Sequence, residues 1–357
     1  MHLVKDAEVS GKRVLLRIDS DVPLVGGKIE DESRLLSAIP TIEYLLKAGA
    51  KIVIAGHLGR PNGFDKALSL EPVARWLGVK YKVLSIKSGK RGEFGGWEIG
   101  ENIFLLENLR FNEGEEKNDL KFAKKLASLA DIYVNDAFAM CHRSHASVVG
   151  ITKFLPHFAG LHLQREVEVL KKVLTDPQRP LVVLIGGAKL ETKLPLVEKM
   201  HHVADYVLVG GKLAIETKAL LKIQHEKIVG RKSALLIADL NPEGTDITSK
   251  SAENFLQIID LAKTVVWNGP LGKMSDDKLM ISEGEEASRK LAKGLAKSNA
   301  YVIVGGGDTV GFLEKACSLD SAACLPKNGC FFSTGGGAML SFLAGEKLPG
   351  VEALTSS

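Results

Sequence analysis

The sequence predicts an α/β fold of two domains, each built on a parallel sheet with helices on both faces. Apolar runs of strand length alternate with longer helical patterns, which is typical of a buried parallel sheet. The 357 residues exceed what one ordinary core holds, so we expect about two domains. Nearly every expected strand runs into Gly, Asn or Asp, and ligands of open α/β sheets bind beyond the carboxyl ends of the strands.

The first half contains expected strands at 13–18, 51–55, 103–107 and 131–135. Each is an apolar run that stops at a turn or a polar residue, as where 51–55 meets Gly56-His57-Leu58-Gly59-Arg60. Helical patterns cover 32–48, which closes at Gly49, and 122–129. Residues 89–100 are rich in glycine and polar side chains, so we expect a surface loop there.

The second half repeats the pattern, with expected strands at 181–185, 206–209, 234–238, 264–267, 301–304 and 330–333. A long helical stretch over 160–174 precedes them and stops at Asp176-Pro177, a sequence typical of a helix end. We interpret this stretch as the connector, so that the domains cover 1–158 and 179–340 and the interdomain segment covers 159–178. The pattern is broken over 221–247, where no boundaries are predicted.

The composition, with 45% hydrophobic and 25% charged residues, is that of a soluble globular protein. The net charge of +4 is mild, and lysines interleave with glutamates, which favours a local anion site over nucleic-acid binding. No apolar run reaches the roughly 20 residues of a membrane span, and the N-terminus lacks the apolar core of a signal peptide. The four cysteines include no CxxC pair, so we expect no zinc site. So few cysteines in a chain of this length fit a reducing compartment, and we expect a cytoplasmic protein.

Glycines and lysines in the second half indicate a binding site for a nucleotide polyphosphate. Gly186-Gly187-Ala188-Lys189 follows an expected strand, and Lys193 comes four residues after Lys189. Glycine lets the backbone approach a phosphate closely, and a helix N-terminus supplies N–H donors and partial positive charge. The alternative is that both lysines lie on a solvated helix face. Similar segments follow other strands: Trp267-Asn268-Gly269-Pro270, Gly305-Gly306-Gly307-Asp308-Thr309 and Ser333-Thr334-Gly335-Gly336-Gly337.

Two standard nucleotide motifs are absent. The segment GPLGK at 269–273 has the wrong spacing for GxxxxGK(S/T) and is followed by Met274. The segment GGGDTVG at 305–311 is one residue too long for GxGxxG, and no acidic residue follows at a strand end about 20 residues on. Asp308 could instead hold Mg²⁺, which takes one or two carboxylates plus phosphate oxygens. The alternative role of Asp308, a helix N-cap, is compatible with this one.

Arginines in the first half indicate a site for a small anion. Guanidinium groups bind carboxylates and phosphates with two parallel hydrogen bonds. Arg60, Arg110 and Arg143 lie at or just past strand ends, and Arg34 lies near a helix start. A single arginine is more often part of a surface ion pair, but four at comparable topological positions favour a binding site. His57 lies among them as a hydrogen-bond donor to the anion, with a structural histidine as the alternative.

No Cys–His or Ser–His–Asp arrangement stands out in the sequence. If the acceptor is a carboxylate, it is already ionised at neutral pH. Phosphoryl transfer to it then needs positioning and charge neutralisation but no general base. Nucleotide-type residues in one half and anion-type residues in the other therefore indicate an enzyme that moves a phosphoryl group between two ligands.

Taken in order, these motifs resemble those of the phosphoglycerate kinase family over nearly the whole chain. The similar segments of the first half are RVLLRIDSDVPL, GHLGRP, LLENLRFNEGEE and YVNDAFAMCHRSHAS. Those of the second half are IGGAKLETK, VVWNGPLG, VGGGDTVGF, STGGGAML and EKLPGVEAL. So many segments in the same order do not agree by chance.

The resemblance implies two Rossmann-like, three-layer αβα domains with parallel sheets, joined by an interdomain helix and a hinge. It implies a monomer whose segment 341–357 packs back on the first domain. The implied reaction is reversible, Mg²⁺-dependent phosphoryl transfer between 1,3-bisphosphoglycerate with ADP and 3-phosphoglycerate with ATP, in glycolysis and gluconeogenesis. The implied ligands are small molecules, with no nucleic acid and no membrane as partner. Domain closure would exclude water from the acyl phosphate.

The resemblance also implies roles for individual residues. The acid site would comprise Asp19, Asp21, Arg34, His57, Arg60, Arg110 and Arg143. The nucleotide site would comprise Gly187, Ala188, Lys189, Lys193, Gly211, Asn268, Pro270, Gly306, Gly307, Asp308 and Thr309, with Asp308 as the metal ligand. The transferring phosphoryl group would be stabilised by Arg34, Lys189, Lys193, Gly336 and Gly337.

Four features depart from the family's pattern. Asp21 replaces the usual Asn, and its carboxylate can accept from the substrate hydroxyl but would repel the substrate carboxylate. Lys212 replaces the last glycine of a usual triplet, which narrows the room near the adenine. Ser275 stands near the place of a glutamate that contacts ribose, and the stretch 221–247 is shorter than usual. These departures bear on ligand affinity more than on the chemistry.

Two alternatives stay open from the sequence. The first is a dehydrogenase that uses a dinucleotide, which the GGGDTVG segment favours and the missing ribose acid and extra lysines oppose. The second is a catalytically weak or silent relative that acts as a nucleotide-binding protein. Asp21 and Ser275 favour this second alternative, and it is opposed by the intact Arg34, Lys189, Lys193 and Asp308.

Overall fold

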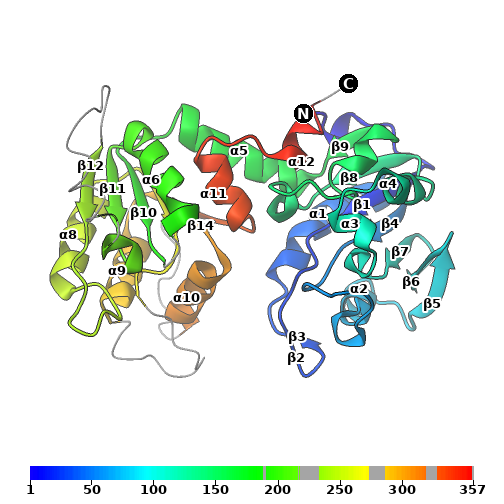
Figure 1. Ribbon diagram of the computed structural model, residues 1–357, viewed down its shortest axis with the longest axis horizontal. Coiled ribbons are helices and arrows are strands. Elements are labelled where there is room, and N and C mark those ends of the chain that lie inside the picture. The colour runs from blue at the N-terminus through cyan, green and yellow to red at the C-terminus, as the bar shows by residue number, and fades with distance from the viewer. Residues whose placement is uncertain (188–189, 216, 218–232, 273–285, 319–327, 356–357) are drawn as a thin grey trace. The chain divides into compact units, whose positions relative to one another are not determined.

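The computed structural model describes residues 1–187, 190–215, 217, 233–272, 286–318 and 328–355 (Figure 1). The chain forms two compact units, one of Met1–Glu168 with Lys347–Ser357 and the other of Val169–Glu346. The boundary between the units falls within the long helix α5 (Leu161–Thr175), after Glu168. The C-terminal segment belongs to the first unit, where the N–H of His2 donates to the carbonyl of Leu354 at 3.1 Å.

The first unit is built on a seven-stranded sheet in the order β5-β6-β7-β4-β1-β8-β9. Strands β1, β4, β7, β8 and β9 pair in parallel, and β1, β7 and β8 are almost wholly buried, as their apolar sequences favour. A separate antiparallel ribbon of β2 (Leu24–Val25) and β3 (Lys28–Ile29) follows β1. The sheet strands are β1 (Arg13–Arg17), β4 (Lys51–Ala55), β5 (Lys87–Arg91), β6 (Phe94–Ile99), β7 (Ile103–Leu106), β8 (Ile132–Asn135) and β9 (His157–Ala159).

Helices α1 and α2 join these strands in one hydrophobic cluster. Leu35 and Ile42 of α1 and Val73 of α2 are buried in it with Leu16 and Ile54 of the central strands. The other helices are shorter, and they include the 3-10 helix η3 (Leu109–Phe111) after β7. The α-helices of this unit are α1 (Ser33–Lys47), α2 (Glu71–Lys80), α3 (Glu113–Glu116), α4 (Leu120–Ala127) and α12 (Pro349–Glu352).

Residues 89–100 do not form the expected loop. They belong to a hairpin of β5 and β6, and β6 also pairs antiparallel with β7, so this sheet is mixed and not wholly parallel. The glycines that suggested a loop permit close packing instead. A Cβ atom at Gly96 would lie 2.0 Å from the carbonyl oxygen of Leu105 on the neighbouring strand. Glycine here marks the close approach of two backbones.

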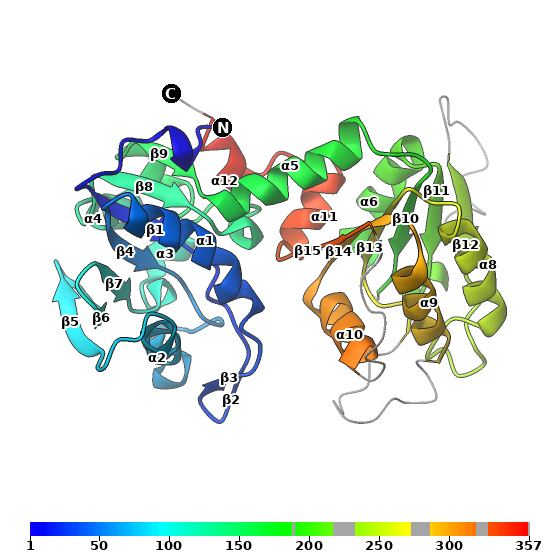
Figure 2. The ribbon, with the colours of Figure 1, turned by 180° about the vertical axis from the view of Figure 1, so that it is seen from behind.

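The second unit is built on a six-stranded parallel sheet in the order β12-β11-β10-β13-β14-β15. Helices α8, α9 and α10 pack against one another, and α6 packs against α11, with the sheet between the two groups (Figures 1 and 2). The strands are β10 (Leu181–Ile185), β11 (Tyr206–Val209), β12 (Ala234–Ile237), β13 (Thr264–Asn268), β14 (Tyr301–Gly305) and β15 (Cys330–Ser333). The helices are α6 (Leu190–Val203), α8 (Ser249–Ile259), α9 (Glu286–Lys297), α10 (Gly307–Ser318) and α11 (Gly337–Leu343).

The predicted α/β class with two sheet-based domains is confirmed. In the second sheet the chain moves outward from β10 through β11 and β12, then returns beside β10 with β13 and moves outward on the other side. The first sheet has the same reversal between β1 and β8. Such topological switch points open a crevice at the carboxyl ends of the strands, so each unit has a candidate binding crevice. Every helix in the described part of the chain is too short or too polar to cross a membrane.

Candidate active site

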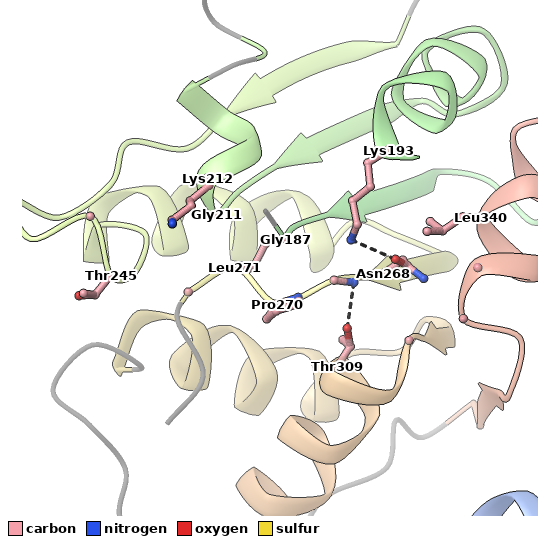
Figure 3. A pocket seen from close by; sticks show the side chains of 16 residues that line it. Gly187, Lys193, Gly211, Lys212, Thr245, Asn268, Pro270, Leu271, Thr309 and Leu340 are labelled. Atoms are coloured by element: carbon pink, nitrogen blue, oxygen red, sulfur yellow. Dashed lines mark hydrogen bonds between the residues drawn. The ribbon is translucent and has the colours of Figure 1, made fainter. Parts of the chain in front are cut away.

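A cavity of about 620 Å³ lies at the switch point of the second sheet (Figure 3). Its walls come from the segments that follow all six strands of the sheet, next to the beginnings of α6, α10 and α11. The lining residues are Gly187, Lys193, Gly211, Lys212, Gly244, Thr245, Asn268, Gly269, Pro270, Leu271, Gly272, Gly306, Thr309, Gly336, Gly337 and Leu340.

Most residues expected to contact a nucleotide are brought together around this cavity. Ala188 and Lys189 lie outside the described residues, as do Ser275 and the side chain of Asp308. Thr245 also lines the cavity but was not predicted, because it lies in the stretch where the sequence pattern is broken. The expected residues found in the lining are Gly187, Lys193, Gly211, Asn268, Pro270, Gly306, Thr309, Gly336 and Gly337.

The side chain of Lys193 points toward Asn268 and is held at the wall of the cavity (Figure 3). Its Nζ donates to the carbonyl of Gly186 and, at 3.2 Å, to Oδ1 of Asn268. Only glycine fits at position 269, because a Cβ atom there would lie 2.1 Å from the carbonyl oxygen of Gly186 and the backbone has a φ of +90°. An ammonium group held in this way needs little reorganisation to meet an anion.

The loop after β13 is held by one hydrogen bond to α10 and by another to β13 itself. The N–H of Gly269 donates to Oγ1 of Thr309 at 2.8 Å, and Nε1 of the fully buried Trp267 donates to the carbonyl of Gly269 at 2.9 Å. Helix α10 begins at Gly307, directly beside the lining residue Gly306. Backbone N–H groups and partial positive charge at such helix starts favour phosphate groups. The cavity therefore has the chemistry of a polyphosphate site.

In the first unit, charged side chains gather at the carboxyl ends of β1 and β4. NH1 of Arg34 lies 3.1 Å from Oδ2 of Asp19 and 4.0 Å from Oδ2 of Asp21. Nε2 of His57 lies 3.8 Å from the same Asp21 oxygen. The other Asp21 oxygen, Oδ1, accepts from the N–H of Gly59 at 2.8 Å. The structure thus brings together four of the residues expected in the acid site.

Arg110 reaches the same cluster from the loop after β7. Its NH1 donates to the carbonyl of Gly59 at 2.6 Å, and its Nε pairs with Glu116 at 3.0 Å. Burial lowers the pKa of Arg110, and the nearby charge of Arg143 lowers it further. Arg60 is exposed on the loop after Gly59, and within the described residues no ion pair holds it to the cluster.

Burial shifts the pKa of two members of this cluster. It raises the pKa of Asp19, while the guanidinium of Arg34 opposes the shift. It lowers the pKa of His57 well below the usual value, and the charges of Arg17 and Arg110 lower it further. His57 is therefore a neutral ring at pH values near 7.

Beneath the cluster lies a buried network that the sequence-based site did not include. Nε of the fully buried Arg17 donates to Oγ of Ser147 at 3.0 Å, and its NH2 lies 3.0 Å from Nδ1 of His57. Ser147 donates its hydroxyl and its N–H to the buried carboxylate of Glu115 at 2.5 and 2.9 Å. His145 lies 3.7 Å from Glu115. The one available signal was Arg17, which directly follows the apolar run of β1.

Nearly the whole chain matches a family model described as "Phosphoglycerate kinase", at residues 4–233 and 222–346. The chain belongs to the phosphoglycerate kinase family. A phosphoglycerate kinase of Moorella thermoacetica is 38% identical, with 99% of this chain and 98% of the relative covered. The phosphoglycerate kinase of Dictyoglomus turgidum is 36% identical, with 98% and 97% covered.

Solved phosphoglycerate kinase structures agree with this assignment. The enzyme of Coxiella burnetii matches with a TM-score of 0.77 at 33% identity, and covers 99% of this chain and 98% of its own. That of Pyrococcus horikoshii matches with a TM-score of 0.78 at 29% identity and the same coverage. The chain is therefore a kinase of glycolysis that uses ATP and ADP. None of these relatives favours a catalytically silent nucleotide-binding protein.

Proposed function

We propose that the cluster of the first unit binds 3-phosphoglycerate and 1,3-bisphosphoglycerate, and that the cavity of the second unit binds ADP and ATP. The phosphoryl group would move reversibly between the acid and the nucleotide. One observation carries the assignment of the nucleotide. Lys193 is fixed by Gly186 and Asn268 in a cavity of about 620 Å³ at a topological switch point. This arrangement suits a polyphosphate, and its size suits a nucleotide.

In the nucleotide cavity, Lys193 would contact the terminal phosphate, and the backbone at Gly336-Gly337 would donate N–H bonds to it. Lys193 and the segment Gly336-Gly337 both line the cavity. Thr309 would support the loop that approaches the phosphates, because its Oγ1 accepts from the N–H of Gly269 at 2.8 Å. Lys189 and Ala188, next to Gly187 in the chain, would complete the contacts.

In the acid site, Arg34, Arg110 and Arg143 would bind the carboxylate and phosphate of 3-phosphoglycerate, and His57 would donate a hydrogen bond. We assign these residues to the acid site because Arg34 and His57 both lie near Asp21 and because Arg143 lies near Arg110. The exposed Arg60 would meet the outer part of the ligand. Guanidinium groups suit this role because they bind both anion types with two hydrogen bonds.

The chemistry would require no general base. The carboxylate of 3-phosphoglycerate is ionised at neutral pH and is itself the nucleophile. Arg34 and Lys193 would neutralise charge on the transferred phosphoryl group, and loss of one such donor typically lowers kcat by about 10²–10³. The protein would thus act by positioning and charge neutralisation.

Mg²⁺ would enter as part of the nucleotide substrate, because it prefers phosphate oxygens with one or two carboxylates. Asp308, in the first turn of α10 beside the cavity, is the carboxylate that we propose for it. We also propose a monomer in the cytoplasm. The presence of both the acid cluster and the nucleotide cavity in one chain supports the monomer, and the small number of cysteines supports a reducing compartment.

Calorimetry on two variants tests the division between the sites. Arg110→Met should abolish the binding of 3-phosphoglycerate and leave ADP binding unchanged, whereas Lys193→Met should weaken ADP binding only. Arg75→Met is the control, because Arg75 is exposed and pairs with Glu71 on α2. If Arg110→Met weakened ADP binding, or Lys193→Met weakened binding of the acid, the assignment of ligands would be wrong.

A further inference from the structure

The imidazole of His57 meets different partners at its two nitrogens. Nδ1 lies 3.0 Å from NH2 of Arg17, and both side chains are almost completely buried. Nε2 lies 3.8 Å from Oδ2 of the half-exposed Asp21, which is beyond hydrogen-bond distance. One ring nitrogen therefore faces a buried cation, and the other faces the proposed acid site.

The contact with Arg17 determines where His57 carries its proton. A guanidinium group has only N–H donors and no acceptor, so a hydrogen bond from Arg17 needs a lone pair on Nδ1. A neutral ring protonated on Nδ1 would set two donors against each other, and so would an imidazolium. The contact is satisfied by the neutral tautomer with its proton on Nε2.

Arg17 is itself held in place by contacts at its other nitrogens. Nε donates to Oγ of Ser147 at 3.0 Å, and NH1 donates to the carbonyl of Ile18. Ser147 is fixed in turn by the carboxylate of Glu115, which accepts from its hydroxyl and its N–H. Glu115 is fully buried and supplies the negative charge that compensates Arg17. The guanidinium is thus anchored on the side away from His57.

We propose that Arg17 is a positioning residue that fixes His57 as the neutral tautomer protonated on Nε2, and so presents a permanent hydrogen-bond donor to the acid substrate. This inference rests on the proposed acid site. The phosphate and carboxylate oxygens of 3-phosphoglycerate are acceptors, so an Nε2–H group suits them and a lone pair on Nε2 would repel them. A donor that is already oriented in the free protein needs no reorganisation on binding.

The charged groups around the ring act in the same direction. Arg17 from β1, Arg110 from η3 and Arg34 from α1 all disfavour a positive charge on His57, as does His145. On the opposite side, the Asp21 carboxylate faces Nε2 and favours a proton there. The surroundings therefore support a neutral ring with its N–H directed at the proposed site.

The tautomer can be measured directly in the full-length, ligand-free protein labelled with ¹⁵N-histidine. Long-range ¹H–¹⁵N correlation distinguishes the two neutral tautomers and the imidazolium, and the spectrum of His57→Gln identifies the His57 signals. We expect the pattern of a ring protonated on Nε2, unchanged between about pH 8 and about pH 6. A ring protonated on Nδ1, or an imidazolium near neutral pH, would overturn the proposal.

Variants of Arg17 test whether it is the cause. Arg17→Met should give a mixture of both neutral tautomers and weaken 3-phosphoglycerate binding about tenfold, the effect of one misplaced charge-assisted hydrogen bond. Arg17→Lys, which keeps the charge and a donor, should restore the Nε2 tautomer. Arg13→Met is the matched control, because Arg13 lies on the same strand but is exposed and pairs with Asp131. If Arg17→Met bound the acid weakly while His57 kept its proton on Nε2, Arg17 would not act through His57.

A gentler variant covers the case in which Arg17→Met does not fold. Ser147→Ala removes the partner of Nε and the hydroxyl hydrogen bond to Glu115 but leaves the guanidinium itself in place, so it should loosen Arg17 and give a detectable fraction of the second tautomer. An unchanged His57 spectrum in Ser147→Ala would count against the anchoring. Failure of the wild-type protein to bind 3-phosphoglycerate would instead overturn the acid site, and the wild-type spectrum distinguishes that result from a wrong tautomer.

Discussion

Replacing Asp21 with Asn should tighten the binding of 3-phosphoglycerate. Oδ1 of Asp21 accepts from the N–H of Gly59 at 2.8 Å, and an amide oxygen can keep that bond. Oδ2 lies 3.8 Å from Nε2 of His57 and 4.0 Å from NH1 of Arg34, too far for a hydrogen bond to be lost. The local structure should survive, while one negative charge leaves the site that must accept an anion.

The expected gain follows from the exposure of Asp21. Its side chain is 39% exposed, so its charge acts through a largely aqueous medium. Two like charges about 5 Å apart then repel by about 1 kcal/mol, which corresponds to roughly fivefold in Kd. The gain should shrink with added salt, because the Debye length is about 10 Å at 0.1 M.

Calorimetric titration with 3-phosphoglycerate measures this effect. Asp65→Asn is the matched control, because the exposed Asp65 also accepts a backbone N–H, from Ala67 at 2.9 Å, but lies outside the cluster. An unchanged or weaker Kd in Asp21→Asn would refute the reasoning. It would show that the carboxylate contributes to binding, as an acceptor for the substrate hydroxyl would.

Three further predictions concern the other parts of the molecule. Lys193→Ala should lower kcat about a hundredfold or more in steady-state assays, because it removes a fixed cation from the cavity; near-normal kcat with unchanged circular dichroism would exclude that role. Lys212→Gly should lower the KM for the nucleotide, because Lys212 lines the cavity and its side chain narrows the room for the ligand. An unchanged KM would show that the Lys212 side chain does not hinder binding of the nucleotide. Burial lowers the pKa of His162 to about 4, so as pH falls through about 6.5 the unfolded chain takes up this proton first and stability is lost. The change in the free energy of unfolding caused by His162→Gln should therefore be about 2 kcal/mol more stabilising at about pH 5 than at about pH 7.5, as measured by urea unfolding. An equal change at both pH values would contradict the lowered pKa of His162.

The parallel strands could be predicted because burial on both faces makes them continuous apolar runs. β4 (Lys51–Ala55) and β10 (Leu181–Ile185) lie where the sequence placed them, and the helix expected over 160–174 is α5 (Leu161–Thr175). These elements carry their signal in local composition and periodicity. Their position in the sheet, and hence the switch points, then follows from the connections.

The hairpin at the edge of the first sheet could not be predicted in this way. β5 and β6 are mostly exposed or half-buried, so they lack the apolar run of a central strand. Their glycines indicate a loop locally, whereas Gly96 is required by the close approach of Leu105 on the next strand. Pairing across the sheet, which a single sequence does not show, decides the structure here.

The residues of the candidate site likewise include some that could be predicted from the sequence and some that could not. His57, Arg110 and Asn268 were predicted because they follow apolar strands, where parallel sheets place their ligands. The support of His57 was not predicted, because Arg17 and Ser147 are 130 positions apart and meet only in the folded chain. Local patterns reveal where a site lies, but the contacts that orient its side chains are tertiary.

The most direct test of the central claim is phosphoryl transfer itself. Consumption of ATP with 3-phosphoglycerate and Mg²⁺ is followed through glyceraldehyde-3-phosphate dehydrogenase and the oxidation of NADH. The account predicts steady turnover that Arg34→Ala abolishes, while calorimetry shows that this variant still binds ADP. Turnover at the wild-type rate in Arg34→Ala, or a wild-type protein that binds both ligands without turnover, would contradict it.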